Sequence, residues 1–243
     1  MIPAMLSIER CCILITEAMA ADNDKNPQKG CGACYEVLRG ITGCYGVLRV
    51  GITGRAGAGK SAFARMLAEN RALVLDADKI AWKLYSNPTV RKNLAETFGR
   101  KILNKDGAVD RKSLGEIVFT NPEKLKRLNA IIHPLLVGEL KHRITRSSQK
   151  VVIIDAALLL DWPLARECDL LIAVESEENV SLARLKSKGS GIKRARSILE
   201  NQRSRQGFRE LCHVVVENNK GLSELKLKAD RIWQERIKPL LDT

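Results

Sequence analysis

The sequence predicts an α/β fold built on a doubly wound parallel sheet of about five strands, with a helical insertion and a lid. Three observations support this prediction. Apolar segments of strand length alternate with helical segments from residue 47 onward, a glycine-rich turn follows the first apolar segment, and residues 79–146 show helical patterns with no strand among them. Strands that alternate with helices form a parallel sheet covered on both faces.

The expected strands are short and apolar. The first covers Val47–Ile52, and the others cover Ala72–Leu75, Val151–Ile154, Leu170–Val174 and Val214–Val216. Continuous apolar runs of this kind are typical of parallel strands that are buried on both faces.

The expected helices fill the intervals between these strands. The first covers about Lys60–Asn70, where apolar residues follow a helical period. Proline suits the first turn of a helix, so we expect helices to start near Pro88, Pro122 and Pro134. A basic helical stretch runs from about Asn179 to Gln206, and an amphipathic helix from about Leu222 to Ile237.

Composition limits the class of protein. The 243 residues are 45% hydrophobic, which suffices for one sizeable core. No apolar run approaches the roughly 20 residues that span a bilayer, and the chain starts without the pattern of a targeting segment. We therefore expect a cytoplasmic protein with no membrane partner.

The net charge of +13 is unevenly distributed. Residues 1–46 hold four basic and five acidic side chains, so the positive excess lies in residues 47–243. A basic surface suits nucleic acid or a phosphate-rich small molecule. Only 4% of the residues are aromatic, which leaves few platforms for stacking bases, so we expect the small molecule and no nucleic-acid partner.

The first 46 residues differ from the rest of the chain. Five of the seven cysteines lie there, and Cys31-Gly-Ala-Cys34 has the spacing of half a zinc site without a second half. Val37–Gly43 also nearly repeats Val47–Gly54. We expect residues 1–46 to be a disordered extension or a mis-assigned start, and residues 47–243 to form the working domain.

A phosphate-binding loop follows the first expected strand. Gly54-x4-Gly59-Lys60-Ser61 fits the P-loop pattern G-x-x-x-x-G-K-[ST], between an apolar strand and an amphipathic helix. Small residues let successive backbone N–H groups turn toward phosphate oxygens, and the helix dipole favours the same anions. Lys60 reaches the β- and γ-phosphates, and the Ser61 hydroxyl is placed to ligate Mg²⁺. The predicted ATP-binding residues are Gly54, Ala56, Gly57, Ala58, Gly59, Lys60, Ser61 and Ala62.

Two carboxylates follow the second expected strand. Asp76 and Asp78 lie near the P-loop in a doubly wound sheet, because the carboxyl ends of parallel strands share one edge. One carboxylate can take the proton of an acceptor hydroxyl while the other holds water, Mg²⁺ or a backbone group. The alternative is that both cap a helix. A GTPase is disfavoured because the guanine-reading Asn-Lys-x-Asp segment is missing, so we predict a P-loop kinase fold and expect Asp78, Lys60 and Asp76 to be catalytic.

The chain from Leu48 to about Ile237 resembles the dephospho-CoA kinase family. The resemblance rests on the order and spacing of several motifs, namely the P-loop, Asp76–Ala81, Phe98-Gly99, Asp110–Leu114, Phe119 with Asn121-Pro122, Ile132–Pro134, Asp155–Leu159, Cys168-Asp169, Gln202 and Asn218. It implies transfer of the γ-phosphate of ATP to the ribose 3′-hydroxyl of dephospho-CoA, the last step of coenzyme A synthesis.

The resemblance also implies roles for individual residues. Asp78 matches the proposed general base, and Asp155 a carboxylate near the Mg²⁺–phosphate site. Arg111, His133 and Pro134 fall in the 79–146 insertion, which holds the CoA moiety in the family. A lid at about 179–210 has phosphate-binding candidates, and these are Arg184, Lys188, Arg196 and Arg209.

Alternatives remain open at several of these positions. His133 can instead cap or pack a helix, Arg111 can be a surface charge, and the basic run can be a solvated face. The lid also departs from the family pattern, with Lys188 and Phe208 in place of Arg and Lys. A lysine does not form the bidentate clamp of an arginine, so lower turnover is expected. Another small-molecule kinase and a nucleic-acid-binding protein remain as other functions, and the oligomeric state is left open.

Overall fold

A computed structural model describes residues 47–118, 120–187, 189, 191–200, 202 and 204–242. The extension predicted at residues 1–46 and Lys188 of the predicted lid lie outside the described residues. Within the part of the chain that the structure describes, no helix has both the length and the apolar character needed to span a bilayer.

Five parallel strands form the sheet, as the sequence predicts. They are β1 (Leu48–Thr53), β2 (Leu73–Asp76), β3 (Val151–Asp155), β4 (Leu170–Glu175) and β5 (Val214–Glu217), in the spatial order β2-β3-β1-β4-β5. The chain leaves the central strand β1 toward one edge and later returns past it to β4, so the strand order reverses beside β1. Ligands bind at the carboxyl ends of the strands at such a point.

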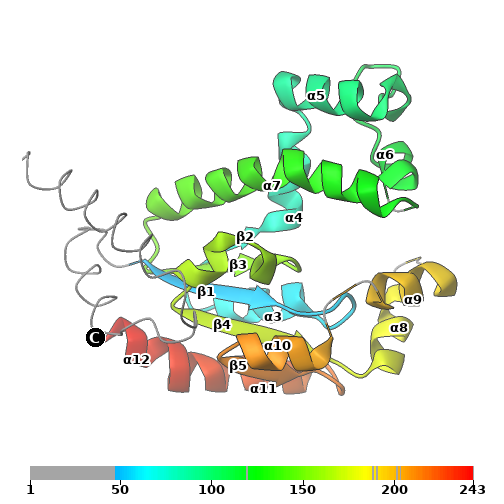
Figure 1. Ribbon diagram of the computed structural model, residues 1–243. Coiled ribbons are helices and arrows are strands. Elements are labelled where there is room, and N and C mark those ends of the chain that lie inside the picture. Colours follow the sequence, from blue (N-terminus) through cyan, green and yellow to red (C-terminus); the bar gives the residue numbers. More distant parts are fainter. Residues whose placement is uncertain are drawn as a thin grey trace, which may run out of the picture. The chain divides into compact units, whose positions relative to one another are not determined.

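Helices cover both faces of the sheet (Figure 1). On one face, α3 (Lys60–Ala68) and α11 (Leu222–Ile232) pack in a core with Val151 and Ile153 of β3. On the other face, α4 (Ala77–Leu84) and α7 (Pro122–Thr145) belong to a core that holds Val152 and Ile154. Successive side chains of a strand point to opposite faces, which is why an unbroken apolar run serves both cores.

The interval between β2 and β3 is helical. It contains α4, α5 (Pro88–Phe98), a 3₁₀ turn at Arg100–Ile102, α6 (Arg111–Val118) and α7, and the β pairing described within it is one isolated bridge between Leu103 and Val109. Asn87 and Asn121 cap α5 and α7 through their side chains, and Pro88 and Pro122 occupy the first turns that follow. These two prolines therefore mark helix starts, as the sequence predicts.

Pro134 contradicts the same prediction, because it lies inside α7. A proline within a helix removes one backbone hydrogen bond and costs about 3 kcal/mol. The helix continues because α7 buries an apolar side chain once per turn on both sides of the proline, at Leu128, Ile132, Leu136, Leu140 and Ile144. Burying each such side chain contributes about 1.5–3 kcal/mol, so the packing of the stripe outweighs the local break.

The basic stretch after β4 is divided into separate helices. They are α8 (Glu178–Ser187), α9 (Ile192–Glu200) and α10 (Arg205–Leu211). Gly189 has a φ of 86°, and its N–H group bonds to the carbonyl of Lys186 at the end of α8. Glycine adopts this left-handed conformation without strain, so it ends the helix there. The chain closes with a π-helical turn (Trp233–Ile237) and α12 (Lys238–Leu241).

Candidate active site

The P-loop joins the end of β1 to the start of α3. Gly54, Gly57 and Gly59 have φ values of 135°, 76° and 100°, which side chains other than glycine adopt only under strain. A Cβ atom on Gly54 would lie 2.1 Å from the carbonyl oxygen of Val174. The loop is therefore pressed against the end of β4, and its glycines are required for both conformation and space.

Asn218 and Arg184 hold the P-loop through the backbone carbonyl of Ala58. The Asn218 Nδ2 atom donates to the carbonyl of Ala58 over 2.8 Å, and Arg184 donates to the Asn218 carbonyl over 3.0 Å and to its Oδ1 over 3.3 Å. Asn218 is buried. In a trans peptide the N–H group points away from the carbonyl, so this contact turns the Gly59 N–H group away from Asn218.

The end of α9 also contacts the loop. The backbone N–H of Ala56 donates to Gln202 Oε1 over 2.7 Å, and the Arg55 guanidinium donates to the carbonyl of Leu199 over 2.8 Å. Lys60 Nζ donates to the Arg55 carbonyl over 3.1 Å. The predicted lid thus contacts the P-loop both through Arg184 of α8 and through Leu199 and Gln202 at the end of α9 and just beyond it.

Asp76 and Asp78 have different surroundings. Asp76 is the N-cap of α4, where Oδ1 accepts from the Lys79 N–H over 3.0 Å and Oδ2 pairs with Lys79 Nζ at 2.9 Å. The capping alternative therefore describes Asp76, whereas Asp78 lies in the first turn of α4. Asp78 keeps an exposed surface, yet the protein around its carboxylate removes enough water to raise its pKa, and the charge of Asp76 acts the same way against the opposing effect of Lys60.

Asp155 ends β3 and lies opposite Asp76 in the parallel register. Burial raises the pKa of Asp155; a hydrogen bond from Ser61 and the charge of Lys60 lower it, and Asp76 and Asp78 raise it again. Three carboxylates, the P-loop lysine and the Ser61 hydroxyl therefore meet at one end of the sheet. This group can hold a charged phosphate ligand on its cationic side and accept a proton on its anionic side.

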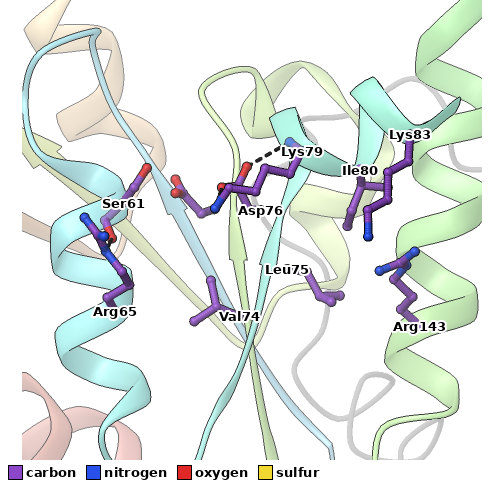
Figure 2. A pocket seen from close by; sticks show the side chains of 10 residues that line it. Ser61, Arg65, Val74, Leu75, Asp76, Lys79, Ile80, Lys83 and Arg143 are labelled. Atoms are coloured by element: carbon purple, nitrogen blue, oxygen red, sulfur yellow. Dashed lines mark hydrogen bonds and ion pairs between the residues drawn. The ribbon is translucent and has the colours of Figure 1, made fainter. Parts of the chain in front are cut away.

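A groove of about 520 Å³ opens beside Asp76 and Asp155. Figure 2 shows Ser61 and Arg65 on one side of strand β2, and Ile80, Lys83 and Arg143 on the other. The lining combines apolar side chains with Asp76, Asp155 and cations, the latter being Arg65, Lys79, Lys83 and Arg143. Such a lining suits a ligand with both apolar and anionic parts.

The predicted residues of the helical insertion make defined contacts. Arg111 places Cζ 4.1 Å from the centre of the Trp82 ring. His133 Nδ1 accepts a hydrogen bond from Trp162 Nε1 over 3.2 Å, and burial lowers its pKa against the effect of Asp161. The packing alternative therefore accounts for one nitrogen of His133. Pro134 is exposed on α7, and no described contact joins it to the P-loop.

The described lid candidates do not come together. Arg184 contacts the P-loop, and Arg196 is exposed on α9. Arg209 instead binds Glu175 Oε2 and Glu217 Oε1, at 3.0 and 2.9 Å, at the ends of β4 and β5. Glu175 is buried and also accepts from Arg205. Within the described residues, Arg184 is therefore the lid candidate that reaches the loop.

Sequence reasoning did not place three side chains in the site. Asn218 and Gln202 were named only as part of the family resemblance, and Trp82 was not predicted to be a site residue. Trp82 lies four residues after Asp78 on α4, so its helical spacing was the available signal.

Replacing Asn218 by Ala is expected to weaken the P-loop. The change removes the side-chain amide that donates to the Ala58 carbonyl and accepts from Arg184 Nη2. The backbone carbonyl of residue 218 still accepts from Arg184 Nη1. A buried group that loses its hydrogen-bond partner costs about 1–3 kcal/mol. We expect a KM for ATP raised about 5- to 100-fold, together with a lower midpoint of thermal unfolding. The control is Asn219→Ala, since Asn219 binds Glu177 and not the loop. Equal effects of the two changes would contradict the assignment.

Known proteins are similar to this chain over most of its length. A family model described as dephospho-CoA kinase matches residues 48–224. The dephospho-CoA kinase of Fusobacterium nucleatum is 38% identical over 190 residues, which cover 77% of this chain and 98% of that protein. That of Thermobifida fusca is 36% identical over 194 residues, which cover 78% and 96%.

Solved structures share the fold. TT1252 from Thermus thermophilus matches with a TM-score of 0.68 and 25% identity, over 79% of this chain and 98% of that one. The dephospho-CoA kinase from Campylobacter jejuni matches with a TM-score of 0.53 and 22% identity, over 78% and 97%.

Proposed function

Because this chain belongs to the dephospho-CoA kinase family, we propose that its P-loop and the carboxylates at the ends of β2 and β3 transfer the γ-phosphate of ATP to the ribose 3′-hydroxyl of dephospho-CoA. The observation that carries the assignment to this site is the meeting of Lys60, Ser61, Asp78 and Asp155. The chain is thus an ATP-dependent transferase of the last step of coenzyme A synthesis.

Asp78 is proposed as the general base. Its carboxylate takes the proton of the 3′-hydroxyl while the oxygen forms a bond to the γ-phosphorus, and the bond to the β-phosphate oxygen breaks to release ADP. Lys60 and the P-loop N–H groups stabilise the charge that develops on the phosphate oxygens. The raised pKa of Asp78 makes its carboxylate a stronger base than an ordinary aspartate.

Mg²⁺ is proposed to bind at Ser61 and Asp155. The charge of Asp76 raises the pKa of Asp78, and the charges of Asp76 and Asp78 raise the pKa of Asp155, so a divalent cation would offset this repulsion. Among the described residues no group of three or more His, Cys, Asp or Glu side chains forms a metal cage, and Mg²⁺ commonly takes only one or two protein carboxylates plus phosphates and water. When bound, it supplies charge neutralisation between the phosphates.

We further propose that residues 47–243 form the kinase domain, with residues 79–146 as the part that binds dephospho-CoA. Arg111, His133 and Pro134 are its candidate contacts, and about 179–210 is the lid, with Arg184 its best-supported phosphate-binding residue because it already lies at the P-loop. The cytoplasmic location stays a prediction.

A coupled assay of ADP release tests the function. With ATP and dephospho-CoA we expect ADP release to depend on the acceptor and the product to gain one phosphate by mass spectrometry. A panel of nucleosides serves as the comparison, and we expect little activity with any of them. Turnover of a nucleoside with none of dephospho-CoA would overturn the proposal. Tight binding of duplex DNA that weakens steeply with added salt would instead favour a nucleic-acid-binding role.

A further inference from the structure

Asp78 and Trp82 lie on α4, and a second aromatic residue, Tyr85, is the C-cap of this helix. Trp82 and Tyr85 follow Asp78 by four and seven residues, a spacing that places all three on the same face of a helix. The rings of Trp82 and Tyr85 meet edge to face, with centres 5.2 Å apart and an interplanar angle of 85°. Lys79, Ile80 and Lys83 line the groove of Figure 2 and so mark a different side of α4.

Arg111 reaches this aromatic face from α6. Its Cζ atom lies 4.1 Å from the centre of the Trp82 ring, within the range of a cation–π contact. Arg111 is exposed, and among the described residues its side chain makes this ring contact and no ion pair or hydrogen bond. Trp82 thus holds the guanidinium of Arg111 over its ring, and the N–H groups of Arg111 stay available for a ligand.

The charges of Arg111 and Asp78 also both act on Tyr85. Burial raises the pKa of the Tyr85 hydroxyl, while the charge of Arg111 lowers it and that of Asp78 raises it. The cation of Arg111 and the proposed base are therefore both close enough to Tyr85 for their charges to act on its hydroxyl.

We propose that Trp82 positions Arg111 to bind the 5′-diphosphate of the acceptor nucleotide. This inference rests on the proposed function, which puts the acceptor's 3′-hydroxyl at Asp78. The 5′-diphosphate is attached to the same ribose, and Trp82 lies one helical turn from Asp78, about 6 Å along α4. A guanidinium binds phosphate oxygens through two parallel hydrogen bonds. Arg111 already covers the Trp82 ring, which favours the diphosphate over stacking of the acceptor's base on Trp82.

A double-mutant cycle tests the positioning role. We would measure kcat and the KM values for dephospho-CoA and ATP in Trp82→Leu, Arg111→Ala and the double variant. Trp82→Leu is expected to raise the KM for dephospho-CoA about three- to thirtyfold, which corresponds to the loss of a cation–π contact, with the KM for ATP unchanged. In the Arg111→Ala background the same change is expected to have no further effect. Trp82→Phe, which keeps a ring, should restore most of the affinity, whereas Arg111→Lys should not.

The control variant is Lys112→Ala, which removes a neighbouring positive charge of α6 that does not stack on Trp82, and its KM values should match those of the wild type. The midpoint of thermal unfolding is measured for each variant to identify those that fail to fold. If Trp82→Leu or Arg111→Ala fails to fold, the KM values of Trp82→Phe and Arg111→Lys decide the test. If Trp82→Leu raises the KM equally with and without Arg111, Trp82 contacts the acceptor directly and this inference is wrong. A wild-type protein that does not phosphorylate dephospho-CoA would instead refute the proposed function.

Discussion

Asp78→Asn is expected to lower kcat by about two to four orders of magnitude, the usual contribution of a general base. The amide keeps the shape of the side chain but has no basic oxygen, so the acceptor's proton loses its destination. The KM for ATP should stay within a few-fold of the wild-type value, because Asp78 does not belong to the loop that binds the phosphates. Asp106→Asn, an exposed change in the same helical insertion, is the control and should keep full activity. A full kcat in Asp78→Asn would show that another group takes the proton.

The pKa of Asp78 adds a pH test of the same assignment. Loss of hydration and the charge of Asp76 raise this pKa above the ordinary value of 3.8, and the base acts only when it is ionised. The kcat of the wild type should therefore fall as the pH drops through a value above 3.8, and this step should be missing in Asp78→Asn. The folded pKa exceeds the unfolded one, so ionisation of Asp78 destabilises the fold as pH rises through that window. Asp78→Asn should consequently unfold at a slightly higher temperature at neutral pH.

Lys60→Met is expected to lower kcat by at least two to three orders of magnitude, comparable with the loss of a donor that stabilises developing negative charge. Lys60 Nζ is held at the P-loop by the Arg55 carbonyl, and its charge lowers the pKa of both Asp78 and Asp155. Its removal should therefore weaken ATP binding in a calorimetric titration. It should also move the acidic limb of the pH–kcat profile to higher pH.

Lys92→Met is the control for this prediction, since Lys92 is an exposed lysine that pairs with Glu96 on α5. Its kcat and its pH profile should match those of the wild type. A Lys60→Met variant with the kcat of the wild type would mean that the P-loop does not position the phosphates as proposed.

The sheet and the P-loop could be predicted from sequence because their signals are local. Each strand is a continuous apolar run, and the loop is one uninterrupted motif between a strand and a helix. The position of Asp76 near the P-loop also followed, since parallel strands end at the same edge of a sheet, whereas Asp155, which lies opposite Asp76, entered through the family resemblance. These inferences need only the order of elements and the direction of the strands.

Contacts between distant segments could not be predicted in this way. Asn218 reaches Ala58 across 160 positions of the sequence, and Trp162 reaches His133 from a different element. Arg209 was expected to face phosphate, but its side chain binds Glu175 and Glu217. The prediction of a helix start at Pro134 was wrong for a related reason. The helix continues through this proline because α7 has a buried apolar stripe, and that stripe depends on the core against which it packs. In each case tertiary packing decides, and the local pattern is compatible with several outcomes.

The position of β1 at the centre of the sheet has a consequence for the growing chain. Both neighbours of β1 are made much later, since Leu48 pairs with Val151 and Val50 with Leu170. Synthesis at about 5–20 residues per second needs on the order of 5–20 s to reach the first of them. A helix such as α5, whose sequence holds no internal proline, depends more on nearby residues and can form during this delay. Until β3 has been made, the apolar strand β1 and the P-loop that follows it have no strand with which β1 can pair. During this time β1 is prone to aggregation.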